Sequence, residues 1–225
     1  MEENGGRKKV SMIFDTRKFE LIDISMKIKP VMPVYKGRKE KLPRFTTEAD
    51  FTNATIFESR VDLNLHTGTH MDSAHHMMPE GEWIDSVRLE EFFVPCSVID
   101  CSEVESEITM EHLKKHEIHA GEFVLLKTRN SFEDILEKDF VFLEKSGAAY
   151  LKDKNIIGVG TDGLGIERSQ PGHETHLTLM EQGIHILEGL RLSHVQAGEY
   201  ILIAFPLFIA NVEAAPVRAV LLKAK

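Results

Sequence analysis

Residues 66–76 decide how this chain is interpreted, and they read His66-Thr67-Gly68-Thr69-His70-Met71-Asp72-Ser73-Ala74-His75-His76. Four of the eleven histidines of the chain fall within this stretch, together with one carboxylate. Two imidazole nitrogens and a carboxylate oxygen suit Zn²⁺ or Mn²⁺, and a site with three protein ligands leaves a position for water. The spacing therefore predicts that His66, His70 and Asp72 bind one metal ion.

The residues that precede this stretch predict how its first histidine is presented. Apolar and polar residues alternate over residues 61–66, so on a strand the apolar Val61, Leu63 and Leu65 face the core and His66 faces away from it. A turn-prone break at residues 67–69 then lets the chain fold back. Histidines in a polar loop that form hydrogen bonds without binding metal remain an alternative. An HExxH zinc helix is excluded, because a threonine stands where the glutamate is required.

A second group of ligands is needed if the site holds two ions, as the sites of many hydrolases do. The best candidate is residues 171–188, where the apolar spacing indicates a helix with His176 near its start. A short apolar run over residues 184–187 predicts a strand, and Glu188 follows it directly. Spacing alone leaves both side chains equally compatible with ordinary structural roles.

Short apolar or alternating runs rich in β-branched residues dominate the rest of the chain and predict strands. These runs cover residues 20–28, 54–65, 92–99, 123–127, 156–160, 200–205 and 217–222. Helices are predicted over residues 109–116 with Thr109 as the N-cap, over 147–152, and over 173–182 with Gly183 at the end. The pattern predicts a mixed α/β protein with a flexible N-terminal leader over residues 1–18 and a single domain over residues 19–225.

Composition limits the classes of partner. The chain has 27 basic and 36 acidic residues, a net charge of −9, which argues against nucleic acid or an anionic membrane surface as a partner. Its apolar runs are shorter than the roughly 20 residues that span a bilayer. Cys96 and Cys101 fit neither a redox pair nor a disulfide framework and are interpreted as buried thiols. These features favour a cytoplasmic protein.

The stretch from His66 to His76 resembles the HxGTHxDxPxH signature of the cyclase-like metal hydrolases, the family of bacterial kynurenine formamidase and isatin hydrolase. The resemblance extends along most of the chain from about residue 20. Residues 23–25 and 32–37 resemble the opening strand and loop of that family, residues 176–188 resemble its HxxLLxxGIxIxExL segment, and residues 201–215 resemble its closing strand and loop.

The resemblance implies a site and a fold. His66, His70 and Asp72 would hold one metal ion, and Asp72 would bridge to a second ion that His176 and Glu188 also bind. His76 would be the catalytic acid and base, whereas His75 is interpreted as a supporting residue. The implied fold is a swivelling β/β/α domain, a barrel-like sheet with outer helices, and the implied assembly is a homodimer or homotetramer.

The resemblance also implies a reaction. It is hydrolysis of a small amide, formamide or cyclic amide, at carbon–nitrogen bonds other than peptide bonds, with two Zn²⁺ or Mn²⁺ ions per subunit. The formamidases carry a tryptophan in the early loop to stack on the substrate, and Tyr35 stands at the similar position here. The signature proline is Ala74, and Met77 replaces the usual aromatic residue. An isatin or lactone hydrolase and a non-catalytic metal-binding protein are the alternatives.

Overall fold

The computed structural model describes residues 16–225 of the chain. The predicted leader, residues 1–18, therefore lies outside the described residues except for its end. That end, Thr16–Lys18, is a 3₁₀ helix (η1) that leads directly into the first strand.

Strands outnumber helices, as predicted. The strands are β1 (Phe19–Asp23), β2 (Arg44–Ala49), β3 (Glu58–Asp62), β4 (His70–Asp72), β5 (Phe93–Asp100), β6 (Glu107–Ile108), β7 (Phe123–Lys127), β8 (Phe142–Leu143), β9 (Gly158–Thr161), β10 (His185–Glu188), β11 (Gly198–Ile203), β12 (Ala214–Pro216) and β13 (Val220–Ala224). The α-helices are α1 (Met110–Leu113), α2 (Lys145–Asp153) and α3 (Glu174–Met180). Further 3₁₀ helices are η2 (Tyr35–Gly37), η3 (Lys39–Lys41), η4 (Ala74–His76), η5 (Ile84–Ser86), η6 (Leu89–Phe92), η7 (Arg129–Ser131) and η8 (Pro171–His173).

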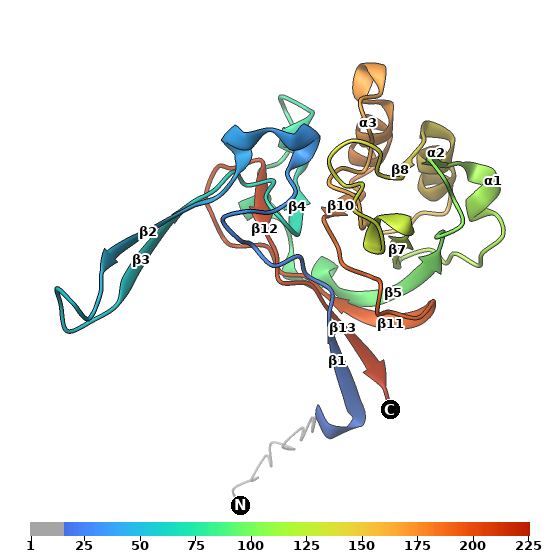
Figure 1. Ribbon diagram of the computed structural model, residues 1–225. Coiled ribbons are helices and arrows are strands. Elements are labelled where there is room, and N and C mark those ends of the chain that lie inside the picture. The colour runs from blue at the N-terminus through green and yellow to red at the C-terminus, as the bar shows by residue number, and fades with distance from the viewer. Residues whose placement is uncertain (1–15) are drawn as a thin grey trace, which may run out of the picture.

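One nine-stranded sheet organises the body of the protein, in the order β1-β13-β11-β5-β7-β9-β10-β4-β12. The neighbours from β5 to β10 are parallel, and the pairs towards both edges are antiparallel. The sheet curls strongly, and α1, α2 and α3 lie together on one side of it (Figure 1). This confirms the predicted mixed α/β class with a barrel-like sheet and outer helices.

The central strand β7 explains why the core has two parts. Every residue of β7 is buried, which is typical of a strand covered on both faces. Phe123 and Leu125 pack into a cluster with Met71 and Leu187, next to the strands that carry the site. Val124 and Leu126 pack on the opposite face, against the residues of α1, α2 and α3. The two cores therefore fix β10 and α3 relative to the same strand.

Strands β2 and β3 form a separate two-stranded ribbon that projects away from the body (Figure 1). The sequence predicted that Val61, Leu63 and Leu65 would face the core from a strand over residues 54–65, and this prediction is wrong. Val61 is 47% exposed, and neither Leu63 nor Leu65 is fully buried. The physical reason is that β3 pairs only with β2, so no second layer covers it.

The predicted helix ends are confirmed in part. Thr109 caps α1 together with the side chain of His112, and Gly183 follows α3 with a positive φ of 68°. Helix α1 is shorter than predicted, because after Leu113 the backbone continues with i to i+3 hydrogen bonds. Cys96 and Cys101 are buried free thiols, as predicted. Within residues 16–225, no helix is long and apolar enough to cross a membrane.

Candidate metal centre

Two paired strands carry the centre of the site. His70 and Asp72 are two residues apart on β4, so their side chains share one face of the strand. The antiparallel partner β10 places Glu188 directly opposite His70. His66 lies in the bend before β4, and His176 is on the third residue of α3. The structure thus brings together all five residues that the sequence suggests as metal ligands.

The carboxylates of Asp72 and Glu188 each have histidines next to both of their oxygens. Oδ1 of Asp72 lies 3.0 Å from Nδ1 of His66 and 3.5 Å from Nε2 of His70, and Oδ2 lies 3.9 Å from Nε2 of His176. Oε2 of Glu188 lies 3.3 Å from Nε2 of His70, and Oε1 lies 3.7 Å from Nε2 of His176. Each carboxylate therefore directs one oxygen towards the β4 side and the other towards α3.

The polar atoms at this centre are incompletely satisfied by protein groups. Nε2 of His70, Nδ1 of His176 and both carboxylate oxygens of Asp72 are buried, and none has an aligned hydrogen-bond partner among the described residues. Buried polar atoms without partners cost free energy, so each calls for an explanation. Ligand atoms of His70, Asp72 and Glu188 lie within 4.8 Å of one another. Nitrogen and carboxylate oxygen donors at this spacing fit Zn²⁺ or Mn²⁺.

Two glycines allow the strands to approach closely enough. Gly68 has φ +68°, and its carbonyl oxygen lies 3.0 Å from Nδ1 of His70, which directs Nε2 into the site. Gly189 follows Glu188 with φ +71°, and a Cβ atom there would lie 2.2 Å from the carbonyl oxygen of Gly68. The hydroxyl of Thr69 donates to the carbonyl of Gly189 at 2.7 Å and joins the two segments.

The charged histidines and carboxylates of the site stabilise one another. Burial disfavours the charged forms of His70 and His176, but the hydrogen bonds and charges of the nearby carboxylates outweigh it. The pKa of His70 rises to about 9 and that of His176 to about 10. Burial likewise opposes the charged carboxylates, but the neighbouring histidines keep the pKa of Asp72 lowered and that of Glu188 well below its usual value. The site therefore holds two carboxylates ready for cations.

His76 stands beside the predicted ligands, and one of its ring nitrogens lies within 4.8 Å of ligand atoms of His66 and Asp72. Its ring lies 4.3 Å from the ring of His66 and 5.8 Å from that of His176, measured between centroids. Burial lowers the pKa of His76, and the attraction of Asp72 only partly opposes this effect. A histidine that is neutral near pH 7 can accept a proton. His75 points elsewhere, because its ring stacks on Trp83 with centroids 3.4 Å apart.

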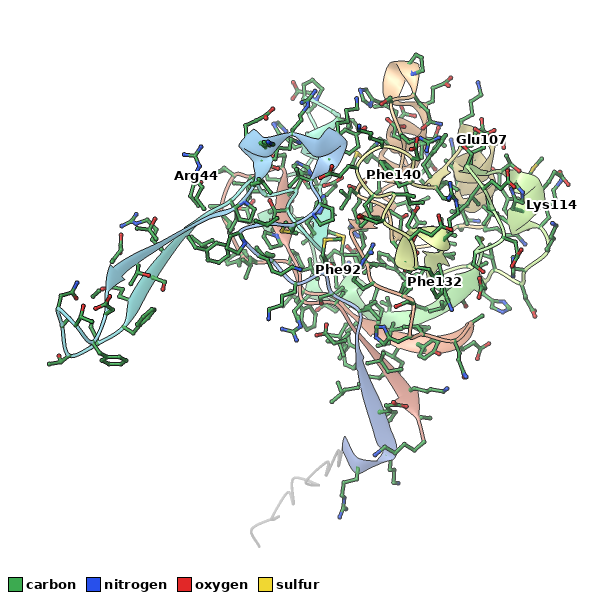
Figure 2. All side chains as sticks on the ribbon, viewed as in Figure 1. Arg44, Phe92, Glu107, Lys114, Phe132 and Phe140 are labelled. Carbon is green, nitrogen blue, oxygen red and sulfur yellow. The ribbon has the colours of Figure 1, made fainter. Side chains whose placement is uncertain are left out.

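A cavity of about 180 Å³ opens onto these residues. Tyr35 lines it, as the sequence suggested, and packs against Phe140 with ring centroids 6.1 Å apart. Phe140 lies within the body of the molecule (Figure 2). The turn at Gly163–Gly165 also reaches the cavity through Leu164 and Gly165. The other lining residues are Arg38, Lys41, His66, His76, Met77, Glu167, His173, His176 and Glu188.

Sequence reasoning did not identify two carboxylates that contact the site. Oε1 of Glu167 lies 3.1 Å from Nδ1 of His176, and Oε1 of Glu213 lies 3.3 Å from Nε2 of His66. Glu213 comes from the loop before β12, which pairs with β4. Neither residue stands at a spacing that singles it out along the chain. The only signal is that residues 201–215 resemble a ligand-proximal segment.

Comparisons with known proteins show the family of the chain. Residues 22–168 match the model of the Cyclase family, described as "Putative cyclase". The matched residues include His66, His70, Asp72 and His76, whereas His176 and Glu188 lie beyond them. The kynurenine formamidase of Salinibacter ruber is 33% identical over 204 residues, which are 89% of this chain and 96% of that protein.

Two solved structures share the fold. One, described as a predicted metal-dependent hydrolase from Bacillus stearothermophilus, is 42% identical with a TM-score of 0.83, covering 91% of this chain and 98% of the other. The other is isatin hydrolase A from Labrenzia aggregata bound to benzyl benzoate, which is 25% identical with a TM-score of 0.81, covering 93% of this chain and 96% of the other. This chain belongs to the cyclase family.

Proposed function

We propose that the protein is a metal-dependent hydrolase of the arylformamidase type, which cleaves a small amide, formamide or cyclic amide. One observation carries the proposal. Asp72 and Glu188 each direct their two oxygens towards different histidines, at the end of a cavity that also contains His76. The kinship with kynurenine formamidases supports a substrate whose carbon–nitrogen bond is not a peptide bond.

The ligand set divides between two ions in this proposal. His66, His70 and Asp72 would hold one ion, and His176 and Glu188 would hold the second, with Asp72 shared between them. This division is supported by the contacts of the carboxylates. His66 faces Oδ1 of Asp72, whereas His176 faces Oδ2 of Asp72 and Oε1 of Glu188. Zn²⁺ or Mn²⁺ bound there would activate water and polarise the scissile carbonyl group.

His76 supplies the proton transfer. Its lowered pKa leaves the ring neutral near pH 7, so Nδ1 or Nε2 can take a proton from water that enters the cavity. The hydroxide that remains adds to the carbonyl carbon, and the same ring returns the proton to the nitrogen of the amine as the carbon–nitrogen bond breaks. Tyr35, Met77 and Leu164 form the apolar side of the pocket, where an aromatic substrate ring would lie.

A cyclic amide or a lactone is the second candidate substrate, because the structure of isatin hydrolase A resembles this one at 25% identity. A non-catalytic metal-binding protein is the third possibility. A panel of N-formyl arylamines, isatins and lactones, tested with the protein loaded with Zn²⁺ or Mn²⁺, separates the three. The proposal expects turnover of at least one amide that chelation abolishes. Metal binding without turnover of any panel member would contradict it.

A homodimer or homotetramer completes the proposal. Side chains of the β2–β3 ribbon project into open space (Figure 2). Phe45 of β2 is 49% exposed, and Phe51 and Phe57 of the loop that joins the two strands are 76% and 59% exposed. A two-stranded ribbon has little stability by itself, so a second copy that covers these rings would stabilise it. We also propose that residues 19–225 act as one domain in the cytoplasm, where the buried free thiols would stay reduced.

A further inference from the structure

Glu167 occupies a buried position between two histidines. Its side chain is 3% exposed, and Oε1 lies 3.1 Å from Nδ1 of His176 and 2.5 Å from Nδ1 of His173. Its other oxygen, Oε2, accepts a hydrogen bond of 3.1 Å from the backbone N–H of Thr175. The carboxylate is therefore fixed to the first turn of α3, the same turn that carries His176.

The ring of His176 spans the distance between Glu167 and the candidate metal centre. Nδ1 lies 3.1 Å from Oε1 of Glu167 but is not aligned for a hydrogen bond, while Nε2 lies 3.7 Å from Glu188 and 3.9 Å from Asp72. Metal-binding histidines generally donate their second ring N–H to a carboxylate or carbonyl group, which fixes the tautomer and the orientation of the ring. His70 receives this support from a backbone carbonyl, whereas the partner offered to His176 is a charged carboxylate.

We propose that Glu167 is the positioning residue for His176, which holds the ring with Nε2 free for the second metal ion. The inference rests on the two-ion site of the proposed function. His173 adopts a left-handed conformation with φ 51° after Gly172 with φ 78°, and its side chain is 57% exposed. His173 therefore contacts Glu167 from the side that faces solvent.

Titration of the metal-free protein with Zn²⁺ against a chromophoric chelator tests this role. Wild type is expected to bind two equivalents. Glu167→Gln is expected to weaken one equivalent about 10- to 100-fold, the range for removal of a carboxylate behind a metal-bound histidine. The other equivalent, held by His66 and His70, should bind as in wild type. Glu174→Gln, which changes an exposed carboxylate on the same helix, is the matched control.

Three results would overturn the inference. They are unchanged binding of both equivalents in Glu167→Gln, equal weakening of both, and an equally large effect of His173→Ala. Glu167→Asp provides the conservative variant, expected to restore part of the lost affinity, in case the glutamine variant does not fold. If wild type itself bound no second equivalent, the proposed two-ion site would fail instead, so the two failures are distinguishable.

A different observation concerns charge at the cavity entrance. Arg38 and Lys41 line the cavity together with His66 and His76, in a protein with a net charge of −9. Within the described part of the chain, no carboxylate forms an ion pair with either cation. Lys36 and Gly37 adopt consecutive left-handed conformations, with φ 57° and 61°, which turn this segment back on itself.

From these two cavity-lining cations we infer that the substrate of the proposed hydrolase carries an anionic group, such as a carboxylate on its aryl ring. Arg38 and Lys41 bind this group. Ammonium and guanidinium groups attract carboxylates, and a guanidinium can bind one with two hydrogen bonds. The aromatic face of Tyr35 lies beside them, with Nζ of Lys41 5.8 Å from its ring centroid. The ring of an aryl carboxylate would thus contact Tyr35 while its carboxylate contacts Arg38 and Lys41.

N-formylanthranilate and formanilide form a matched anionic and neutral pair for this test. Arg38→Gln and Lys41→Gln are each expected to lower kcat/KM about fivefold more for the anionic compound than for the neutral one, the upper range for an exposed ion pair. Lys39→Gln, an exposed residue outside the cavity lining, is the control. Equal effects on both compounds would overturn the inference.

Calorimetric binding of anthranilate to wild type keeps this inference separate from the proposed reaction. Binding that weakens in Arg38→Gln and Lys41→Gln would support the anion site even if neither formamide were hydrolysed. Absence of binding, or binding that neither variant alters, would overturn it.

Discussion

Glu188 and His70 are direct partners across the antiparallel strands β10 and β4, and Oε2 of Glu188 lies 3.3 Å from Nε2 of His70. Glu188→Gln keeps the shape of this side chain but removes its charge. Because a neutral amide is a weak ligand for Zn²⁺, we expect metal affinity to fall at least about tenfold. Competition with a chelator measures it, and Glu181→Gln, an exposed change in the preceding segment, is the control. Wild-type affinity in Glu188→Gln would exclude Glu188 as a ligand.

Asp72 faces histidines on both sides of the site. Asp72→Asn should therefore lower the affinity for both ions, since one substitution removes the charge that both share. Metal content after gel filtration, determined by mass spectrometry, is the measurement. A variant that retained one full equivalent would show that Asp72 is not a bridge.

Protonation of the metal-free site predicts how binding depends on pH. The pKa values of His70 and His176 are raised to about 9 and about 10, against about 6.5 for an unfolded histidine. Their protonated forms thus stabilise the metal-free protein fully below pH ~6.5, and this stability is lost as the pH rises through the folded values.

A metal ion must displace those protons, so binding near pH 7 should release protons, and Zn²⁺ affinity should increase from pH 6 to pH 8. Calorimetry in buffers of different ionisation enthalpy counts the protons released. Affinity that stayed constant over this range would contradict the charge arrangement of the site.

The β2–β3 ribbon predicts the effect of surface substitutions on assembly. Phe51 and Phe57 lie with ring centroids 6.3 Å apart near its tip. Phe51→Ser with Phe57→Ser should shift the protein towards smaller species, because the covering copy loses two aromatic contacts. Light scattering measures the mass, and Phe132→Ser, at a similarly exposed ring on the body, is the control. An unchanged mass would exclude these rings from the interface.

The sequence predicted best what local pattern controls. Phe123–Lys127 is a strand at the predicted residues, because a fully buried parallel strand reads as an unbroken apolar run. Residues 66–76 supplied the centre of the site, since their residue types leave few chemistries. All the suggested ligands meet in space, although their metal-binding roles remain predictions.

Other features depend on contacts between distant segments. Glu167 reaches His176 because the loop before α3 folds over the helix start, and Glu213 reaches His66 because β12 pairs with β4. Neither contact corresponds to a residue spacing that could be recognised in the sequence. Strand β2 was missed because its residues face solvent on both sides and carry no apolar alternation.

The central claim is that the centre binds metal while His76 moves the proton. His76→Ala, compared with wild type at equal metal loading, tests this claim most directly, with hydrolysis of an N-formyl arylamine and bound metal measured on the same samples. We expect kcat to fall about 10²- to 10⁴-fold, the usual contribution of a general acid or base, with metal content unchanged. Wild-type kcat, or loss of metal together with activity, would contradict the role assigned to His76.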